Sequence, residues 1–316
     1  MGCVTLAAVD YPTSPLSRAS YPRSSLMSAP SYIVITPARN EAATLGLTVA
    51  SMAGQSVRPH RWVIVNDGST DSTAEIIDTA AADFPWIRAV HRNDRGFRQQ
   101  GGGVVETFLD GLHAVEGEPW QYLVKFDADL SFDPDYFQRC LQKFDQDPTL
   151  GIGGGMIVCE KDGKYICESP GDPSFHVRGA TKIYTRRCWD AIGGLVQAPG
   201  WDTIDELKAN MLGFTTRTFP DVPLRHHRET GSADGVWKDA VKNGHGCYVT
   251  GYHPLFMAAK CIRRLAHRPL LVRGVGQAWG FCRAYFKDVK QLTDPSLRAY
   301  IQKQQLNKLL LKPSLW

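Results

Sequence analysis

Four short apolar runs alternate with helix-like segments over residues 32–126, and this alternation constrains the fold more than any other feature. The apolar runs, each typical of a buried strand, are Tyr32–Thr36, Trp62–Val65, Ile87–Val90 and Tyr122–Phe126. The segments between them that have helical spacing cover roughly residues 41–53, 71–82 and 102–114. This order predicts an α/β fold with a largely parallel sheet. Because ligands of open parallel sheets bind beyond the carboxyl ends of the strands, the residues that follow each strand are the first candidates for a site.

Polar and acidic residues follow three of these four strands. They form the segments Pro37–Glu41, Asn66–Asp71 and Asp127–Asp129. Asp67 leaves its strand into the tight turn at Gly68 and Ser69, where its carboxylate can accept hydrogen bonds from a base or a ribose. Helix capping by Ser69 and Asp71 is the alternative interpretation of this segment.

Asp127 and Asp129 are two residues apart, so their side chains lie on the same side of an extended segment. Two carboxylates that converge in this way repel each other unless a cation lies between them. Mg²⁺ or Mn²⁺ prefers such hard oxygen ligands, and a phosphate can complete the coordination shell. A solvated turn is the alternative for an isolated pair at this spacing.

Taken together, the segments Pro37–Glu41, Val65–Asp71 and Phe126–Asp129 resemble family-2 glycosyltransferases in their order and spacing. The resemblance extends over roughly residues 31–235. It implies the GT-A fold, an α/β Rossmann-like fold of nucleotide-diphospho-sugar transferases with a mixed sheet and flanking helices. It also implies a nucleotide-sugar donor and inversion at the anomeric carbon, as in a metal-dependent hexosyltransferase.

The resemblance also implies roles for the residues at the strand ends. Donor base and ribose would be held by the first two segments, through Pro37, Arg39, Asn40, Glu41, Asp67, Gly68 and Ser69. Asp127 would lie near the ribose and diphosphate and share the metal, and Asp129 would ligate Mn²⁺ or Mg²⁺. The ion would neutralise the charge on the departing diphosphate. Arg98, in a glycine-rich crossover, is a candidate for contact with the diphosphate, with a flexible turn as the alternative.

A general base for the acceptor hydroxyl is expected at the start of a helix that begins near Gly200 and ends near Gly213. Counting back from Gly213 puts Asp202 in the position of the family's base, with Trp201 where the family has Glu. Asp205, one turn further along, is the rival candidate. Helix capping by Asp202 is the alternative, and a carboxylate at a helix start is also kept ionised by the helix dipole.

Further candidates flank this helix. Gly193 and Gly194 match the small-residue turn beside the acceptor in the family, and Trp201 either stacks on a sugar ring or belongs to the core. His226 or His227 is expected to ligate the metal, and only one of them can face the site if the chain is extended there. Arg228 is expected on a phosphate. A surface turn with a histidine packed on Trp237 is the alternative.

The charge of the chain is unevenly distributed. The whole sequence has 36 basic and 32 acidic residues, but residues 251–316 hold 12 Lys and Arg and only two acids. Two amphipathic stripes occur in this basic tail, from Leu255 to Ala266 and from Val272 to Phe286. Such helices suit an anionic membrane interface. The alternative is a helix pair that packs on the catalytic domain and leaves its cations in solvent. Nucleic acid is not expected, because no recognition motif accompanies the charge.

These observations divide the chain into three parts: a Ser- and Pro-rich segment 1–30 expected to be disordered, a catalytic domain 31–250, and a basic helical tail 251–316. The cysteines form no C-x-x-C pair, and neither a signal peptide nor a spanning helix is indicated. We therefore expect a cytoplasmic enzyme attached peripherally to the inner face of the cell membrane.

The expected reaction is sugar transfer to a lipid-linked or other saccharide acceptor in surface polysaccharide or glycolipid synthesis. The alternatives are a nucleotidyltransferase that makes nucleotide sugars and a non-catalytic scaffold of the same fold. A nucleotidyltransferase would need a glycine-rich loop with Arg and Lys directly after the first strand, where this chain has Pro37–Glu41.

Overall fold

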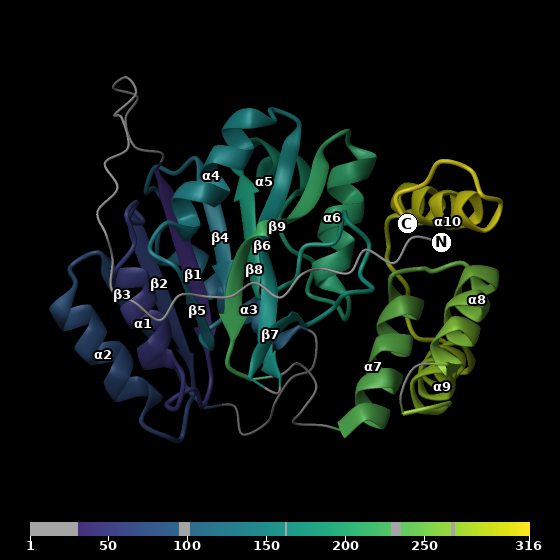
Figure 1. The fold of residues 1–316 in the computed structure, drawn as a ribbon, viewed down its shortest axis with the longest axis horizontal. Helices are drawn as coiled ribbons and strands as arrows, with labels where there is room; N and C mark the ends of the chain where they lie inside the picture. Colours follow the sequence, from purple (N-terminus) through teal and green to yellow (C-terminus); the bar gives the residue numbers. More distant parts are fainter. Residues whose placement is uncertain (1–30, 95–101, 162, 229–234, 267–268) are drawn as a thin grey trace.

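The computed structural model describes residues 31–94, 102–161, 163–228, 235–266 and 269–316, so Arg98 and the segment 1–30 lie outside the described residues. The described part is an α/β fold, with one mixed sheet, helices on both of its faces, and a group of C-terminal helices beside it (Figure 1). The predicted fold class is confirmed.

Within the described residues the sheet has nine strands, and its first half is parallel, as predicted. The parallel strands are β1 (Tyr32–Ala38), β2 (Arg61–Asp67), β3 (Ile87–Arg92) and β4 (Tyr122–Phe126). Beyond β4 the order is β8, β6, β9 and β5, with β7 paired to β6. The bounds of these strands are Thr181–Thr185, Leu150–Lys161, Thr215–His226, Leu130–Phe132 and Lys164–Cys167. Because β8 runs antiparallel to both β4 and β6, the sheet as a whole is mixed.

Alternate residues of the parallel strands face opposite sides of the sheet and build two core layers. On one side Val34 and Trp62 pack with α1 (Leu45–Ala53), α2 (Thr73–Asp83) and α4 (Tyr136–Gln146). On the other side Ile35 and Val63 pack with α3 (Gly103–His113), α5 (Arg186–Ile192) and α6 (Trp201–Met211). Both faces are covered, as is usual for parallel strands, so the strand ends are held firmly in place.

The C-terminal helices form a second group, composed of α7 (Gly235–Val249), α8 (Pro254–Leu265), α9 (Val272–Phe286) and α10 (Pro295–Leu309). Helices α7 and α9 pack so closely that a Cβ atom added at Gly244 or Gly280 would overlap a backbone carbonyl of the other helix. The composition of the sequence changes near residue 250, but the helical group begins earlier, because α7 packs against α9. The shared core of the group reaches the sheet body through Phe175, Ile204 and Leu207.

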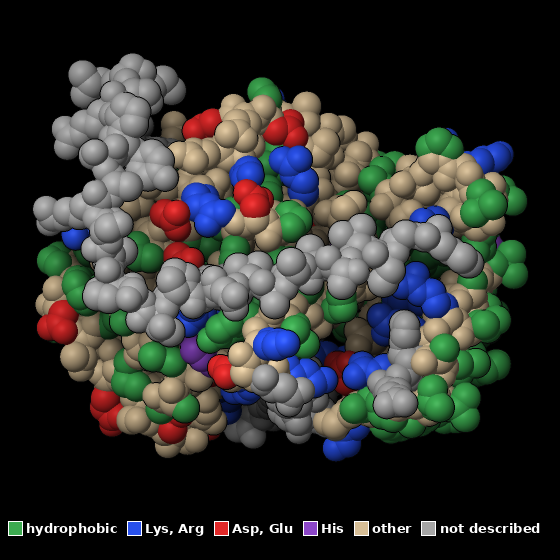
Figure 2. Space-filling model, viewed as in Figure 1, with side chains coloured by type: hydrophobic (Ala, Val, Ile, Leu, Met, Phe, Trp, Pro, Cys, Tyr) green, Lys and Arg blue, Asp and Glu red, His purple; other side chains and the backbone are tan. Residues whose placement is uncertain are grey.

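The predicted apolar stripes of α8 and α9 face solvent, and other residues make the packing contacts. Leu255, Ile262 and Phe286 are 63%, 68% and 82% exposed, whereas Met257 and Phe281 are buried. Figure 2 shows the hydrophobic side chains on the outer surface of this helical group. No helix within the described residues has the length and apolar character needed to cross a bilayer.

Candidate active site

A cavity of about 2530 Å³ lies between the sheet body and the C-terminal helices. The body contributes the β1–α1 loop, the turn Asp127–Asp129, parts of the segment 166–178 and the start of α6, and the opposite wall comes from α7, α8 and α9. Lys and Arg side chains gather in this hollow (Figure 2). Pockets for one small ligand usually measure about 300–1,000 Å³, so this cavity has room for two substrates.

The loops after β1 and β2 interlock into one unit. The backbone N–H of Asn40 donates to Ser69 Oγ at 3.0 Å, and that of Thr70 donates to Asn40 Oδ1 at 2.8 Å. Gly68 has a φ of +67°, and a Cβ atom there would overlap Asp94, so the turn requires glycine. Gly68 and Ser69 therefore shape the loop. The other predicted donor residues of these two loops line the cavity: Pro37, Arg39, Asn40, Glu41 and Asp67.

Asp67 is oriented by a cation at the end of β3. Its Oδ1 lies 2.7 Å from Nη1 of Arg92, which also reaches Glu106 and Asp110 of α3 at 2.7 and 2.8 Å. The guanidinium of Arg39 donates to the carbonyl of Asp67. Arg92 was not predicted as a site residue from the sequence. Its place after the third strand was nevertheless a signal, because the other strand ends carry polar groups.

Asp127 and Asp129 follow β4 in different environments. The side chain of Asp127 is 32% exposed and pairs with Lys125, which lies two residues earlier and therefore on the same side of the chain. Asp129 is buried, with Oδ2 3.2 Å from Nη2 of Arg228 and 3.3 Å from Nε2 of His226. Burial raises the pKa of Asp129, but its interactions with His226, Arg228 and Lys125 more than offset this and lower the pKa below its usual value.

His226 bridges two carboxylates, because its Nδ1 lies 3.1 Å from Glu168 Oε2 while its Nε2 faces Asp129. Burial alone would lower the pKa of His226, but the hydrogen bonds to both carboxylates raise it to about 9. His227 points elsewhere, with Nε2 2.9 Å from Ser131 Oγ. The structure thus brings the imidazole of His226, not that of His227, to the carboxylate of Asp129. Glu168 follows the strand pair β6–β7 and had no sequence signal.

The residues around Asp129 fit a metal that is shared with a substrate. No group of three or more His, Cys, Asp and Glu side chains in the described parts of the chain is arranged to hold an ion. Asp129 and His226 nevertheless bring a carboxylate oxygen and an imidazole nitrogen within 3.3 Å of each other, and this nitrogen can ligate an ion once it has lost its proton. The second nitrogen of His226 lies on Glu168, the arrangement that orients ligating histidines in metal sites. One or two protein ligands suffice where phosphate oxygens and water complete the shell.

Arg228 occupies the space between two predicted donor loops. Its guanidinium contacts both Glu41 and Asp129. Burial raises the pKa of Glu41, an effect that Arg228 partly counteracts. The side chain of Arg228 is 49% exposed, so it lies at the surface of the cavity, where an anion can reach it.

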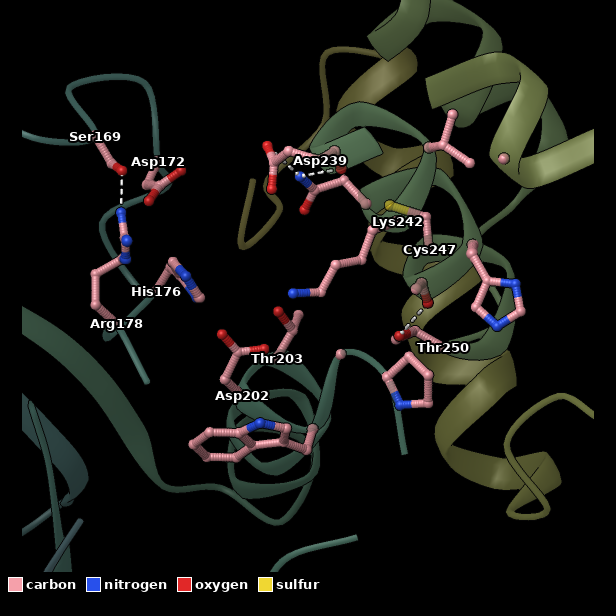
Figure 3. A pocket seen from close by; sticks show the side chains of 18 of the residues that line it. Ser169, Asp172, His176, Arg178, Asp202, Thr203, Asp239, Lys242, Cys247 and Thr250 are labelled. Atoms are coloured by element: carbon pink, nitrogen blue, oxygen red, sulfur yellow. Dashed lines mark hydrogen bonds between the residues drawn. The ribbon is translucent and has the colours of Figure 1, made fainter. Parts of the chain in front are cut away.

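Asp202 lies in the first turn of α6 and lines the cavity. Figure 3 shows its carboxylate directed into the open space, with Thr203 beside it, His176 and Arg178 to one side and Lys242 of α7 above. The helix is capped by Gly200, whose φ is +83°. The capping interpretation of Asp202 is therefore wrong, and its carboxylate is available to the cavity.

Asp205 points the other way, into the sheet body. Its carboxylate lies 2.8 and 2.9 Å from Nζ of Lys182 and 2.6 Å from Oη of Tyr184. Burial raises its pKa to about 6 in spite of Lys182. A step of three residues rotates the side chain by about 60° around the helix, which is enough to turn it from the cavity to β8. Asp205 is not among the described residues that line the cavity.

The predicted acceptor residues have mainly structural positions. Trp201 is buried, and Nζ atoms of Lys125 and Lys182 both lie 5.6 Å from its ring, so it forms part of the cavity wall rather than an open platform. Gly193 and Gly194 end α5 with φ of +72° and +78°. Neither glycine is among the described residues that line the cavity, so their predicted place beside the acceptor is not supported.

A mixed sheet whose strand ends carry Asp67 and Asp127–Asp129 above a shared cavity is the architecture of GT-A glycosyltransferases. Residues 33–187 match the model of Glycosyl transferase family 2. This region of the chain belongs to this family.

Similar proteins agree with this assignment. The chain is 31% identical over 130 residues to undecaprenyl-phosphate mannosyltransferase of Micrococcus luteus, a match that covers 40% of this chain and 51% of that protein. It is 29% identical over 170 residues to chondroitin synthase of Pasteurella multocida, which covers 51% of this chain and 17% of the relative. The chain thus spans about half or less of these curated relatives.

Among solved structures, the mannosyltransferase PcManGT from Pyrobaculum calidifontis, in complex with GDP-Man and Mn²⁺, shares the fold. Its TM-score is 0.51 at 19% identity, with 90% of this chain and 88% of that chain covered. This likeness concerns the fold alone.

Proposed function

We propose that this chain transfers a sugar from a nucleotide-diphosphate donor to an acceptor hydroxyl, with inversion and with Mn²⁺ or Mg²⁺. The observation that carries the proposal is a single cavity that contains the strand-end carboxylates on one side and Asp202, at the start of α6, on the other. One group of side chains can then hold the donor while a separate carboxylate faces the acceptor.

The interlocked loops and Asp67 would hold the base and ribose of the donor. Asp127, Asp129 and His226 lie where its diphosphate would follow. A bound divalent ion would neutralise the charge that develops on the departing diphosphate. Arg228 contacts two carboxylates in this structure. A guanidinium pairs with phosphate oxygens at least as well as with carboxylates, so the diphosphate would compete for Arg228. The neighbour solved with GDP-Man and Mn²⁺ supports this class of donor.

Asp202 is the proposed general base. The backbone carbonyl of Asp202 accepts a hydrogen bond from Lys182, and this bond fixes the first turn of α6. The helix dipole favours the negative charge of the Asp202 carboxylate. In the transfer step the acceptor oxygen forms a bond to the anomeric carbon, the bond to the diphosphate breaks, and the hydroxyl proton moves to Asp202. Attack from the side opposite the leaving group inverts the configuration.

The proposed acceptor is a lipid-linked saccharide, used in surface polysaccharide or glycolipid synthesis at the inner face of the cell membrane. Two observations support it. The apolar stripes of α8 and α9 face outward, which suits peripheral attachment to a bilayer. One curated relative is an undecaprenyl-phosphate mannosyltransferase.

Calorimetric titration of UDP, GDP and dTDP sugars, with and without Mn²⁺, tests the proposal. We expect one nucleotide class to bind in the presence of Mn²⁺, and Asp129→Asn to weaken that binding by about tenfold or more. Asp133→Asn, which removes an exposed carboxylate from the same turn region, is the matched control. No binding of any donor would instead favour the non-catalytic scaffold.

A further inference from the structure

Lys and Arg side chains of the C-terminal helices line one wall of the cavity, and six of these cations are considered together here. They are Lys238 and Lys242 of α7, Arg263 and Arg264 of α8, Arg283 of α9 and Lys287 directly after α9, named here the helical wall. None of them forms an ion pair with a carboxylate in the part of the chain that the structure describes. Figure 2 shows the corresponding concentration of Lys and Arg in the hollow.

The position of these cations is unusual for solvated surface charge. Like charges repel, and a concave surface on which one sign of charge predominates focuses the electric potential into the cavity. Among the described carboxylates that line the cavity, Asp127 and Asp129 already have cationic partners, and Asp172, Asp202 and Asp239 offset only part of the positive charge of the helical wall. The helical wall therefore favours an anionic ligand that enters the cavity.

Lys242 places this anion close to the proposed base. In Figure 3 its side chain extends from α7 across the cavity toward Asp202 and Thr203 on α6. An anionic group held by Lys242 would lie on the acceptor side, away from Asp129 and His226 on the sheet edge. The anion is therefore distinct from the diphosphate of the donor.

Apolar side chains continue from the helical wall to the outside of the molecule. Trp237 and Trp279 line the same cavity and are 46% and 56% exposed. On α9, Trp279 belongs to the outward stripe that includes Val275 and Phe286, whose exposure is 48% and 82%. An anionic head group in the cavity can thus be joined to an apolar chain that leaves along this stripe.

We propose that the helical wall is the acceptor subsite, and that it binds the diphosphate of a lipid-linked saccharide whose apolar chain passes Trp237 and Trp279. This inference rests on the proposed function and specifies its acceptor. The bound diphosphate would position the attached sugar beneath Asp202.

The test uses farnesyl diphosphate as the probe, titrated into the full chain without Mn²⁺ and with EDTA. Inorganic pyrophosphate and farnesol are the partial probes. We expect farnesyl diphosphate to bind at least tenfold more tightly than either, and Lys242→Gln/Arg283→Gln to weaken it at least tenfold. Lys290→Gln/Lys303→Gln, which removes the same charge outside the cavity, should change it less than twofold. The variant Lys242→Arg/Arg283→Lys should restore binding.

The two sites are separated by the Asp129→Asn variant. It should lose Mn²⁺-dependent donor binding and keep the affinity for farnesyl diphosphate. The inference is overturned if farnesyl diphosphate does not bind, if the wall variant binds it like the wild type, or if Asp129→Asn abolishes its binding. Equal affinity for pyrophosphate would overturn the lipid chain as part of the ligand. Failure of the proposed function would have a different result: the wild type would bind no donor in the presence of Mn²⁺.

Discussion

At the sheet edge the carboxylates that face the cavity have cationic partners, whereas the cations of the helical wall have no carboxylate partner among the described residues. Asp67 pairs with Arg92, Asp127 with Lys125, and Asp129 with both His226 and Arg228. The helical wall has the opposite character, with six cations that face open space.

This difference teaches how each side can bind its ligand. At the sheet edge a metal ion and a diphosphate would replace existing partners of the carboxylates. The positions of these carboxylates are therefore set before binding, and the free energy of binding is the difference between two paired states. At the helical wall an anion would meet cations that have no carboxylate partner within the described segments, so electrostatic attraction acts in full but fixes little geometry. The first arrangement suits a chemically demanding donor site, and the second suits recognition of a charged, flexible acceptor.

The largest effect is expected at the point where the two sides meet. Asp202→Asn keeps the shape of the side chain but removes the base, and general bases contribute about 10²–10⁴-fold. We expect kcat to fall by about 10³-fold with the dissociation constant of the donor unchanged, as measured by product formation and by calorimetry.

Asp190→Asn is the control for this variant, because Asp190 is an exposed carboxylate on the neighbouring helix α5. Asp172 also lines the cavity. An active Asp202→Asn together with an inactive Asp172→Asn would assign the base to Asp172 and contradict our proposal.

A second prediction concerns Asp205, which is enclosed by Lys182 and Tyr184 of β8 and Glu206 of α6. Its folded-state pKa of about 6 lies above the usual value for Asp, so the folded protein binds this proton more tightly than the unfolded chain. The stability that this proton provides is present at pH 4 and is lost as the pH rises to about 6. Relative to Asp205→Asn, the wild type should therefore lose up to about 3 kcal/mol of unfolding free energy across this window.

Urea unfolding of both proteins at pH 4, 5, 6 and 7 measures this difference. Asp190→Asn, whose carboxylate is exposed, should show the same pH dependence as the wild type. Parallel stability curves for wild type and Asp205→Asn would mean that Asp205 is ionised throughout this range and that Lys182 outweighs burial.

The sequence predicted the parallel half of the sheet well because its signals are local. The predicted run Tyr122–Phe126 has the bounds of β4, whereas β1 and β2 extend beyond the predicted runs. Pro37 pairs with Val65 and Ala38 with Asn66. This extension depends on the neighbouring strand, and no local pattern contains it.

What the sequence could not predict depends on contacts between distant segments. Glu168 reaches His226 only because β6 pairs with β9 on one edge and with β7 on the other. The amphipathic stripes were recognised, but not the face that packs. In α9 that face contains Gly276 and Gly280, which allow close approach to α7 and which a search for apolar periodicity does not detect.

The third prediction sharpens the sheet-edge side of the comparison. Glu168→Gln keeps a hydrogen-bond acceptor for His226 but removes the charge. Loss of such an orienting carboxylate usually lowers metal affinity about 10–100-fold, and we expect this range for Mn²⁺, measured by titration in the presence of the nucleoside diphosphate of the donor.

Glu160→Gln, at an exposed position of β6, is the control and should leave the affinity for Mn²⁺ unchanged. If Glu168→Gln also has no effect, His226 is not a metal ligand, and the carboxylate has a structural part through its contacts with His226 and Arg178.

The smallest effect is expected on the outer surface of the helical group. Apolar side chains are exposed there, and they can bind a membrane only through hydrophobic contact. Phe286→Ser removes an aromatic ring that is 82% exposed, and partial burial of such a ring in a bilayer contributes roughly 1 kcal/mol. Binding to vesicles of phosphatidylglycerol and phosphatidylethanolamine should weaken by about fivefold in co-sedimentation. Leu212→Ser, which removes a side chain 46% exposed on the sheet body, should have no effect. Equal losses in both variants would mean that the helical group has no special part in membrane contact, and the cations of the helical wall would then act on a soluble acceptor.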